Sequence, residues 1–403
     1  MQPITLFNAP LEFYLFGATL LGVALFHHRT LSVALIGLTA IIAYKFVFTG
    51  FHGEAGAPGL AAHLAHEWVI IANLALLLTG FALLSRHFEQ SNLPDLAPDI
   101  LPDDWTGGLV LLALVFVLSA FLDNIAGALI GATAARHVYK GKVQLGFLAA
   151  IVAAANAGGA GSVVGDTTTT MIWIAGHSPL DVLHAYVGAL ACFAVFAIPA
   201  ARAQQKYQPI LKHDVGEIKA DWARIWIVVF ILVAAIGANV ITNILAPHVS
   251  DLFPVIGAAV WGAILLSALA RKTDWAVLPE AAKGACFLLA LVLCASLMPV
   301  EALPPPSWET TFSLGFISAV FDNIPLTALA LNQGGYDWGM LAYAVGFGGS
   351  MIWFGSSAGV AVSNMFPEAK SVMGWLRAAW WLPAAYVIGF LVMLAIMGWR
   401  PGV

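Results

Sequence analysis

Charged residues are scarce in this sequence of 403 residues. Asp, Glu, Lys and Arg make up 10% of the chain, whereas a soluble domain carries roughly 25%. The hydrophobic fraction is 61% and the mean hydropathy is +0.88. Long apolar runs recur from end to end, and so few charges cannot cover the surface of a soluble domain. The sequence therefore predicts an all-α polytopic membrane protein.

Other features are also missing. There are only three cysteines, Cys192, Cys286 and Cys294. They lie in apolar runs, which predicts buried free thiols and excludes a disulfide or metal framework. The first ten residues lack a basic region, so we expect no cleavable signal peptide. No phosphate-binding loop, nucleophile triad or nucleic-acid surface is evident. We therefore expect no enzyme activity, no cofactor and no nucleic-acid partner.

One short stretch is written twice. Residues 119–125 read SAFLDNI and residues 318–324 read SAVFDNI, and each copy is followed by the pattern Gly-Gly, five residues, Gly. Two motifs in the same order indicate two repeats of nearly equal length. We predict a first repeat at 1–201, a linker at 202–224 and a second repeat at 225–403.

Each repeat has the same predicted plan. The Asp-Asn pair interrupts an apolar segment whose two arms of about 12 to 16 residues are each too short to cross ~30 Å of hydrocarbon as a helix. This predicts re-entrant hairpins at about 107–135 and 309–331. Glycines break the next segments, at about 144–174 and 338–365. The remaining predicted spans are Leu11–Phe26, Leu31–Phe48, Trp68–Leu84, His184–Ala201, 225–245, 253–269, 281–298 and 377–398.

The count of crossings predicts the topology. Each repeat crosses the membrane five times, an odd number, so the two repeats are expected to be inverted. All 17 Lys and Arg except Lys45, Lys283 and Arg400 then fall on one face. That face is predicted to be cytoplasmic by the positive-inside rule. Both termini are therefore expected on the extracytoplasmic side.

Three acidic residues lie at membrane depth: Asp123, Asp166 and Asp322. An unpaired carboxylate there costs at least ~2.5 kcal/mol, so each needs a cation, a proton or a polar partner. Hard cations such as Na⁺ prefer oxygen ligands, which carboxylates, amides and hydroxyls supply. We predict that these acids bind Na⁺. The other predicted ion-binding residues are Asn124, Thr167, Thr168, Asn323, Ser350, Ser356 and Ser357.

Six glycines are predicted to let the backbone unwind beside the ion: Gly158, Gly159, Gly165, Gly348, Gly349 and Gly355. They could instead permit close helix packing. Capping of helix N-termini is the alternative role of the Asp-Asn pairs, and a hydrogen-bond network is the alternative partner of Asp166. Asp166 follows Gly165, whereas Ser356 follows Gly355. We therefore expect an asymmetric site with its main ligands in the first repeat.

Other candidates carry less weight. His63 and His66 have helical i, i+3 spacing, but no third ligand is evident. We place them in the Gly-rich connection before the third span, in an interfacial role rather than a metal site.

These motifs resemble a known family. The run from Gly158 to Trp173, together with both Asp-Asn-Ile motifs and the stretch 348–361, is similar to the NhaD-type sodium/proton antiporters of the ion transporter superfamily. Arsenite and citrate permeases share the likeness at the superfamily level. The resemblance implies inverted repeats, two hairpins, a transport domain beside a scaffold domain, and a homodimer in the bacterial inner membrane. It also implies exchange of Na⁺ or Li⁺ for protons.

The combined interpretation is an alternating-access cation/proton antiporter that handles small inorganic ions within the lipid bilayer. Two alternatives remain. One is an anion transporter of the same superfamily that moves arsenite or a carboxylate, with hairpin amides facing the anion. The other is a non-transporting membrane assembly factor, for which the duplicated acidic motifs would have no use.

Overall fold

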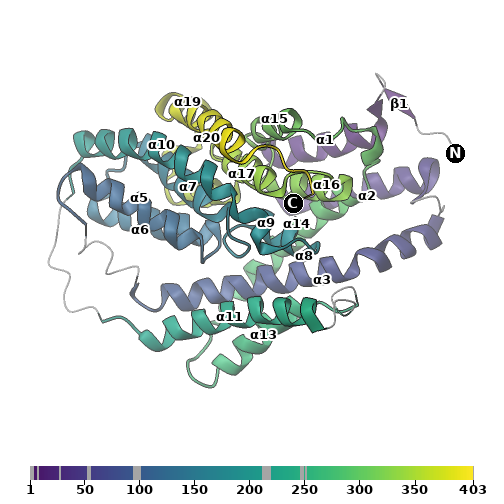
Figure 1. The fold of residues 1–403 in the computed structure, drawn as a ribbon, viewed down its shortest axis with the longest axis horizontal. Helices are drawn as coiled ribbons and strands as arrows, with labels where there is room; N and C mark the ends of the chain where they lie inside the picture. Colours follow the sequence, from purple (N-terminus) through teal and green to yellow (C-terminus); the bar gives the residue numbers. More distant parts are fainter. Residues whose placement is uncertain are drawn as a thin grey trace. The chain divides into compact units, whose positions relative to one another are not determined.

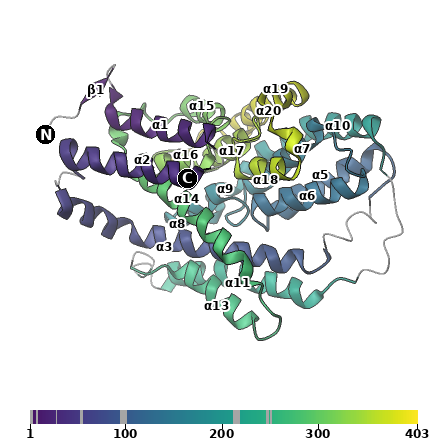
Figure 2. The same ribbon diagram turned by 180° about the vertical axis from the view of Figure 1, so that it is seen from behind.

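The computed structural model describes residues 4–6, 9–26, 29–51, 56–93, 101–210, 219–245, 249 and 252–402. Nearly all regular structure in these ranges is helical (Figures 1 and 2). The exception is a short antiparallel pair, β1 (Thr5–Leu6) with β2 (Ala9–Pro10). Among the described residues, five helices are long and apolar enough to cross a membrane, or six when one bent pair counts as a single span. The chain is thus an all-α polytopic membrane protein, as its composition predicts.

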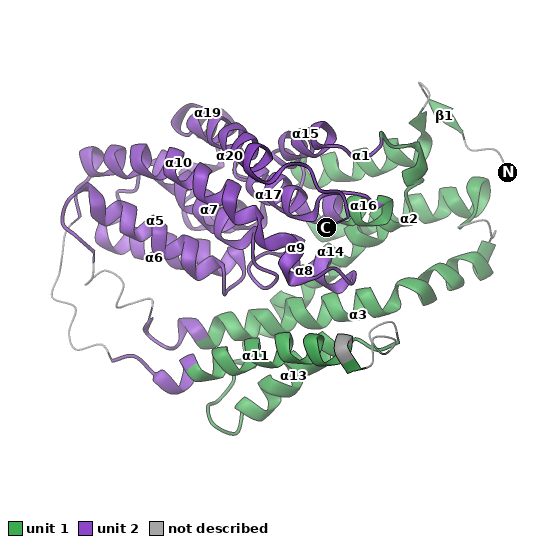
Figure 3. Cartoon of the chain, in the orientation of Figure 1, with its two compact units in different colours: residues 1–87, 226–304, 328–333 green, residues 88–225, 305–327, 334–403 purple. Residues whose placement is uncertain are grey.

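The chain divides into two compact units, each built from segments of both sequence halves (Figure 3). Unit 1 comprises Met1–His87, Trp226–Pro304 and Ala328–Gln333. Within it, α2 packs against α1 and α14. Its helices are α1 (Leu11–Leu25), α2 (Thr30–Tyr44), a π-helical turn (Lys45–Thr49), most of α3 (Gly56–Glu89) and α11 (Trp222–Leu245), α13 (Val255–Ser267), a 3₁₀ turn (Trp275–Val277), α14 (Leu278–Ser296) and a 3₁₀ turn (Val300–Ala302).

Unit 2 comprises Phe88–Ile225, Pro305–Thr327 and Gly334–Val403. Every residue of α17 and every residue of α7 except Leu145 is buried, so these two helices form the centre of its core. The elements of unit 2 are α5 (Trp105–Ser119), α6 (Asn124–Val138), α7 (Leu145–Gly159), α8 (Thr167–Ile174), α9 (Pro179–Leu183), α10 (Ala185–Tyr207), α15 (Trp308–Ser318), the first part of α16 (Asn323–Gln333), α17 (Trp338–Gly348), α18 (Ser357–Met365), a 3₁₀ turn (Pro367–Lys370), α19 (Val372–Ala378) and α20 (Trp381–Met397).

The duplicated motifs lie where helices are interrupted. Each Asp-Asn pair joins two short helices, α5 to α6 and α15 to α16, and α5 packs against α6. The Gly-Gly patterns stand at the ends of α7 and α17, and a non-helical stretch separates each from α8 or α18. The predicted helix breaks are therefore present in both halves.

Several predicted boundaries and placements are wrong. Helix α3 begins at Gly56, twelve residues before the predicted third span, so His63 and His66 are helical rather than in a connection. The glycines predicted a connection there, but Leu60, Ala61 and Ala62 continue the helix. Cys286 is exposed, whereas Cys192 and Cys294 are buried as predicted, because an apolar run in a membrane helix also faces lipid. The predicted linker is partly helical, since α10 extends to Tyr207 and α11 begins at Trp222.

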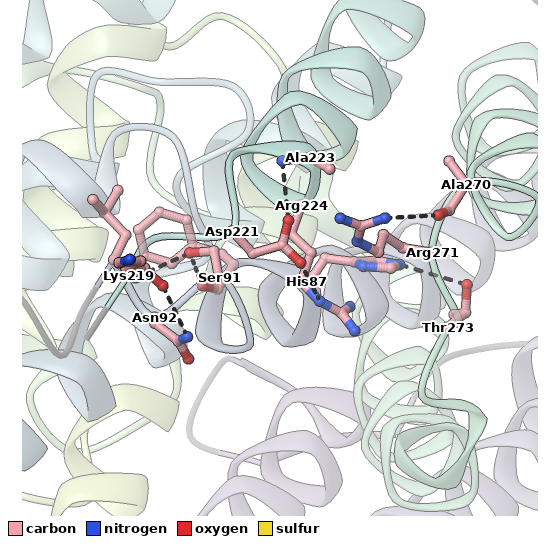
Figure 4. Close-up of polar contacts among 12 residues, drawn as sticks. His87, Ser91, Asn92, Lys219, Asp221, Ala223, Arg224, Ala270, Arg271 and Thr273 are labelled. Atoms are coloured by element: carbon pink, nitrogen blue, oxygen red, sulfur yellow. Dashed lines mark hydrogen bonds and ion pairs between the residues drawn. The ribbon is translucent and has the colours of Figure 1, made fainter. Parts of the chain in front are cut away.

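The segment after α3 contacts the predicted linker (Figure 4). The backbone N–H of Asp221 donates to the Ser91 carbonyl over 2.8 Å, and the Asn92 amide donates to the Lys219 carbonyl over 3.2 Å. The segment that follows α3 and the predicted linker are thus joined within unit 2. Asp95 and Asp99, further along that segment, lie outside the described residues.

The connections of unit 2 gather at the two ends of α10. At its C-terminal end, Gln204 accepts from the backbone N–H of Gln144 over 2.7 Å and donates to the Lys142 carbonyl over 3.1 Å. At its N-terminal end, His184 Nε2 lies 2.7 Å from Asp337 Oδ1, and Asp337 Oδ2 accepts from the Arg400 backbone N–H. Lys142 and the end of α10, which the charge pattern predicts on the same face of the membrane, therefore lie together.

Candidate functional site

Four helices of unit 2 begin at the duplicated motifs, and each start is capped by an oxygen of its preceding side chain. The capping residues are the three predicted ion-binding acids and, in place of a fourth acid, a serine. Such caps satisfy backbone N–H groups that have no partner inside the helix. The alternative role of the Asp-Asn pairs is thus confirmed. The caps are Asp123 to Ile125 N (3.3 Å), Asp166 to Thr168 N (2.7 Å), Asp322 to Ile324 N (3.1 Å) and Ser356 to Gly359 N (3.2 Å).

Asp166 is the centre of a buried polar network, and its residue is only 1% exposed. Asn124 at the start of α6 donates from Nδ2 to Asp166 Oδ2 over 2.8 Å. Asn323 at the start of α16 donates from Nδ2 to Asp166 Oδ1 over 3.1 Å and to Thr168 Oγ1 over 2.9 Å. The two Asp-Asn motifs and the Gly165-Asp166 motif therefore meet at one carboxylate.

Asn156 belongs to this network, although the sequence prediction omits it. It lies in α7 with 0% exposure and accepts from Asn124 Nδ2 over 3.1 Å. Its own Nδ2 donates to Ser350 Oγ over 2.9 Å and to Ser356 Oγ over 3.1 Å. The available signal was a single amide in the apolar run Leu145–Gly159, because a buried amide requires partners.

The other two acids lie nearby but apart from the central network. Asp123 and Asp322 are half-buried, and both act electrostatically on Asp166. Ser357 Oγ donates to Asp322 Oδ2 over 3.2 Å. Thr167 is half-buried at the start of α8. Within the described ranges, no three His, Cys, Asp or Glu side chains are grouped closely enough to hold a metal ion together. The amide groups of Asn124 and Asn323 and the hydroxyl of Thr168 lie beside the Asp166 carboxylate.

The glycines bring backbones into close contact around the network. A Cβ on Gly158 would lie 2.0 Å from the Phe116 carbonyl oxygen, and one on Gly348 would lie 2.2 Å from the Gly315 carbonyl oxygen. Gly165 and Gly355 lie in the non-helical stretches and face the backbones of Ser119 and Ala319. Gly159 and Gly349 pack against the carbonyls of Gly165 and Gly355. Close packing, the alternative that the sequence left open, thus explains all six positions.

The electrostatics favour a cation or a proton at Asp166. The side chains that donate to it are neutral amides, and no Lys or Arg among the described residues pairs with it. Helix N-termini carry a partial positive charge, which stabilises the carboxylate. Neutral donors leave a net negative charge on the network, which one monovalent cation or one proton would compensate.

His63 and His66, which the sequence predicts in an interfacial role, belong to unit 1, whereas the Asp166 network lies in unit 2. His63 is buried in unit 1, where its Nε2 lies 3.0 Å from Ser296 Oγ, and His66 is exposed on the same helix. Neither contributes to a metal site among the residues that the structure describes.

Sequence comparisons identify relatives over most of the chain. A protein from Alkalimonas amylolytica named Na⁺/H⁺ antiporter NhaD is 28% identical over 337 residues, which covers 71% of this chain and 68% of the relative. The protein of the same name from Vibrio cholerae is 26% identical, with coverage of 70% and 68%. Sodium/proton antiporter 1 of Arabidopsis thaliana is 27% identical, with coverage of 72% of this chain and 55% of the relative.

A family model described as citrate transporter matches residues 15–348. That range contains the whole of both Asp-Asn motifs, the first Gly-Gly motif and Asp166. Because the match extends over well more than half of the sequence, the chain belongs to the citrate transporter family.

Proposed function

We propose that this protein is a secondary active transporter that exchanges Na⁺ or Li⁺ for protons by alternating access. The observation that carries the proposal is the buried Asp166 carboxylate, held by the neutral amides of Asn124 and Asn323. The relatives named sodium/proton antiporters support the same ions. The ions are substrates, and the proposal requires no resident cofactor.

Competition for one carboxylate couples the two flows. A proton or a monovalent cation on Asp166 would neutralise the same buried charge, so each excludes the other. Hydroxyl and amide oxygens would complete the shell of a bound cation, and Asp123 and Asp322 would add negative charge beside it. The proposed shell comprises Asn124, Thr167, Thr168, Asn323, Ser350, Ser356 and Ser357.

Two inverted repeats would give this site access from either side. Support comes from the matching helix breaks in both halves and from the loops gathered at each end of α10. We infer re-entrant hairpins at α5–α6 and α15–α16, and both termini on the extracytoplasmic face of a bacterial inner membrane. A homodimer is part of the proposal by analogy with the family resemblance.

Proton flux in liposomes tests the proposal. Purified protein is reconstituted with a pH gradient, and the release of the gradient on addition of Na⁺ or Li⁺ is followed with a fluorescent pH reporter. Wild type should dissipate the gradient, and Asp166→Asn should not, because an amide neither takes up a proton nor offsets a cation. Asp104→Asn is the matched control, since Asp104 caps α5 at an exposed position. If neither Na⁺ nor Li⁺ dissipates the pH gradient in liposomes that contain wild-type protein, the antiporter proposal is wrong.

A second candidate is transport of a carboxylate such as citrate, which the description of the matched family favours. Four capped helix N-termini face the network, and such N-termini can bind an anion. The central carboxylate opposes an anion unless cations bind with it. Uptake of radiolabelled citrate into the same liposomes, with and without Na⁺, separates the two candidates. Citrate uptake without cation-dependent proton flux would favour the carboxylate transporter.

A further inference from the structure

The two Gly-Gly motifs place equivalent positions of the two halves opposite one another. Counting from each motif, Asn156 corresponds to Gly346, Ala160 to Ser350 and Asp166 to Ser356. The two residues of each pair therefore differ in their hydrogen-bonding groups: an amide against no side chain, a methyl against a hydroxyl, and a carboxylate against a hydroxyl. This register allows the two sides of the network to be compared position by position.

One side of the network is filled by polar side chains. Asn156 donates to Ser350 Oγ over 2.9 Å and to Ser356 Oγ over 3.1 Å. On the other side, the corresponding residue, Gly346, has no side chain. A Cβ built on Gly346 would lie 3.8 Å from Ala160 Cβ and 3.8 Å from Asp166 Oδ2. Gly346 thus lies next to Ala160 and Asp166, and these are the residues that correspond to Ser350 and Ser356, the partners of Asn156.

The donors to Asp166 come from other directions. Its Oδ1 accepts from the Thr168 N–H over 2.7 Å and from Asn323 over 3.1 Å. Its Oδ2 accepts from Asn124 over 2.8 Å and, more distantly, from Asn323 over 3.5 Å. None of these donors lies in α17, the helix that contains Gly346. The side of Oδ2 that points toward Gly346 therefore faces a residue without a side chain. The corresponding residue of the first half is Asn156, an amide donor.

We propose that Gly346 determines which cation Asp166 accepts, because its missing side chain leaves one face of the carboxylate oxygen to the ion. This inference rests on the proposed function and deepens it. A methyl group at position 346 reduces the room beside Oδ2 and disfavours the larger Na⁺ relative to Li⁺. An amide at this position donates to Oδ2 and takes the place of the cation.

Two substitutions test the inference. In the liposome assay, Gly346→Ala should raise the half-saturating Na⁺ concentration about tenfold relative to that for Li⁺, the discrimination that one methyl group typically gives. Gly346→Asn should abolish the response to both cations. Alanine favours helices more than glycine does, and 3.8 Å is ordinary van der Waals contact, so Gly346→Ala should fold. Thermal unfolding in detergent verifies this for both variants.

Gly262→Ala is the control, because a Cβ there meets nothing within 4 Å. It should leave the ratio of Na⁺ to Li⁺ half-saturation unchanged. A folded Gly346→Ala variant with the wild-type ratio would overturn the inference while wild-type exchange upholds the proposed function. Absence of Na⁺- or Li⁺-linked proton flux in wild type would instead overturn both. If Gly346→Asn does not fold, the ratio measured for Gly346→Ala decides alone.

Discussion

At the scale of single residues, amide side chains hold the buried network together. Asn124 and Asn156 each donate two hydrogen bonds and Asn323 donates three, and together they join Asp166, Thr168 and two serines. Amides donate and accept without adding charge. They can therefore stabilise a buried carboxylate while leaving its negative charge to be balanced by a transported ion.

Asn156→Ala should destabilise the folded protein by about 2 kcal/mol, because buried hydrogen-bonding groups lose their partner. Thermal unfolding in detergent measures this change. Asn332→Ala is the comparison, since Asn332 makes a single 3.3 Å bond to the Ser296 carbonyl, and it should cost less. Equal stabilities for wild type and Asn156→Ala would contradict the importance of this amide.

The Arg86–Asp274 pair predicts a pH effect outside the site. A hydrogen bond from Arg86 over 2.8 Å lowers the pKa of the Asp274 carboxyl below its ordinary value. With the folded pKa below the unfolded one, the pair stabilises unit 1 above the unfolded pKa of about 3.9, and this contribution is lost as pH falls through the folded pKa. Asp274→Asn should therefore reduce stability at pH 7 and converge with wild type in acid.

Salt provides the check on this pair. Exposed ion pairs are screened by salt, so the difference between wild type and Asp274→Asn at pH 7 should shrink as salt is added. Unfolding temperatures between neutral and acidic pH, at low and high salt, measure it. A difference that grows toward acid would show that Asp274 acts in another way.

At the scale of elements, glycine contacts set how closely the helices around the network approach. Gly158 lies against the Phe116 backbone, so α7 touches α5, and Gly348 lies against Gly315, so α17 touches α15. Backbone atoms cannot move aside as a flexible side chain can. These contacts therefore fix the separation of the helices whose ends carry the network.

Gly158→Ala should destabilise unit 2 by about 3 kcal/mol, since the added methyl would overlap the Phe116 carbonyl and force α5 and α7 apart. Gly348→Ala should act similarly. The matched control is Gly237→Ala, where a Cβ meets nothing within 4 Å. Unfolding temperature and the yield of folded protein report the effect. Wild-type stability in Gly158→Ala would mean that the two helices can separate freely.

At the scale of the whole molecule, the two units combine segments from both halves of the sequence. All residues of the candidate network belong to unit 2, although they come from 123–168 and 322–357. A carboxylate site assembled from both halves fits the inverted repeats of the proposal, in which one site serves two faces.

The proposed topology predicts opposite labelling of two connections. Single cysteines at Lys140 and at Arg400, in a variant without the three native cysteines, should react with an impermeant thiol reagent from opposite sides of the cell membrane. Position 140 should react only after access to the cytoplasm, and position 400 from outside. A cysteine at Lys206 should behave like position 140. Labelling of positions 140 and 400 from the same side would exclude the proposed odd number of crossings.

Most of the helical plan was predictable from the sequence. Apolar run length, scarcity of charge and interrupted segments depend on local physics, because each helix must satisfy its own backbone hydrogen bonds in lipid. The duplicated motifs also identified Asp166, Asn124 and Asn323, since costly polar residues in apolar runs need partners. The early start of α3 and the exposure of Cys286 were not predictable, because in a membrane both lipid and protein favour apolar residues.

The sequence alone determined that this chain is a membrane protein in which an Asp-Asn motif occurs twice. It also identified the three candidate acids, Asp123, Asp166 and Asp322. Only the tertiary structure decided which acid is central, that Asn156 joins Asn124 to the serines, and that Gly346 faces the carboxylate. The physical reason is that hydrogen bonds and backbone contacts between residues distant in sequence depend on the register of α7 against α17. Hydropathy and spacing do not specify that register, because all residues of the two helices except Leu145 are buried.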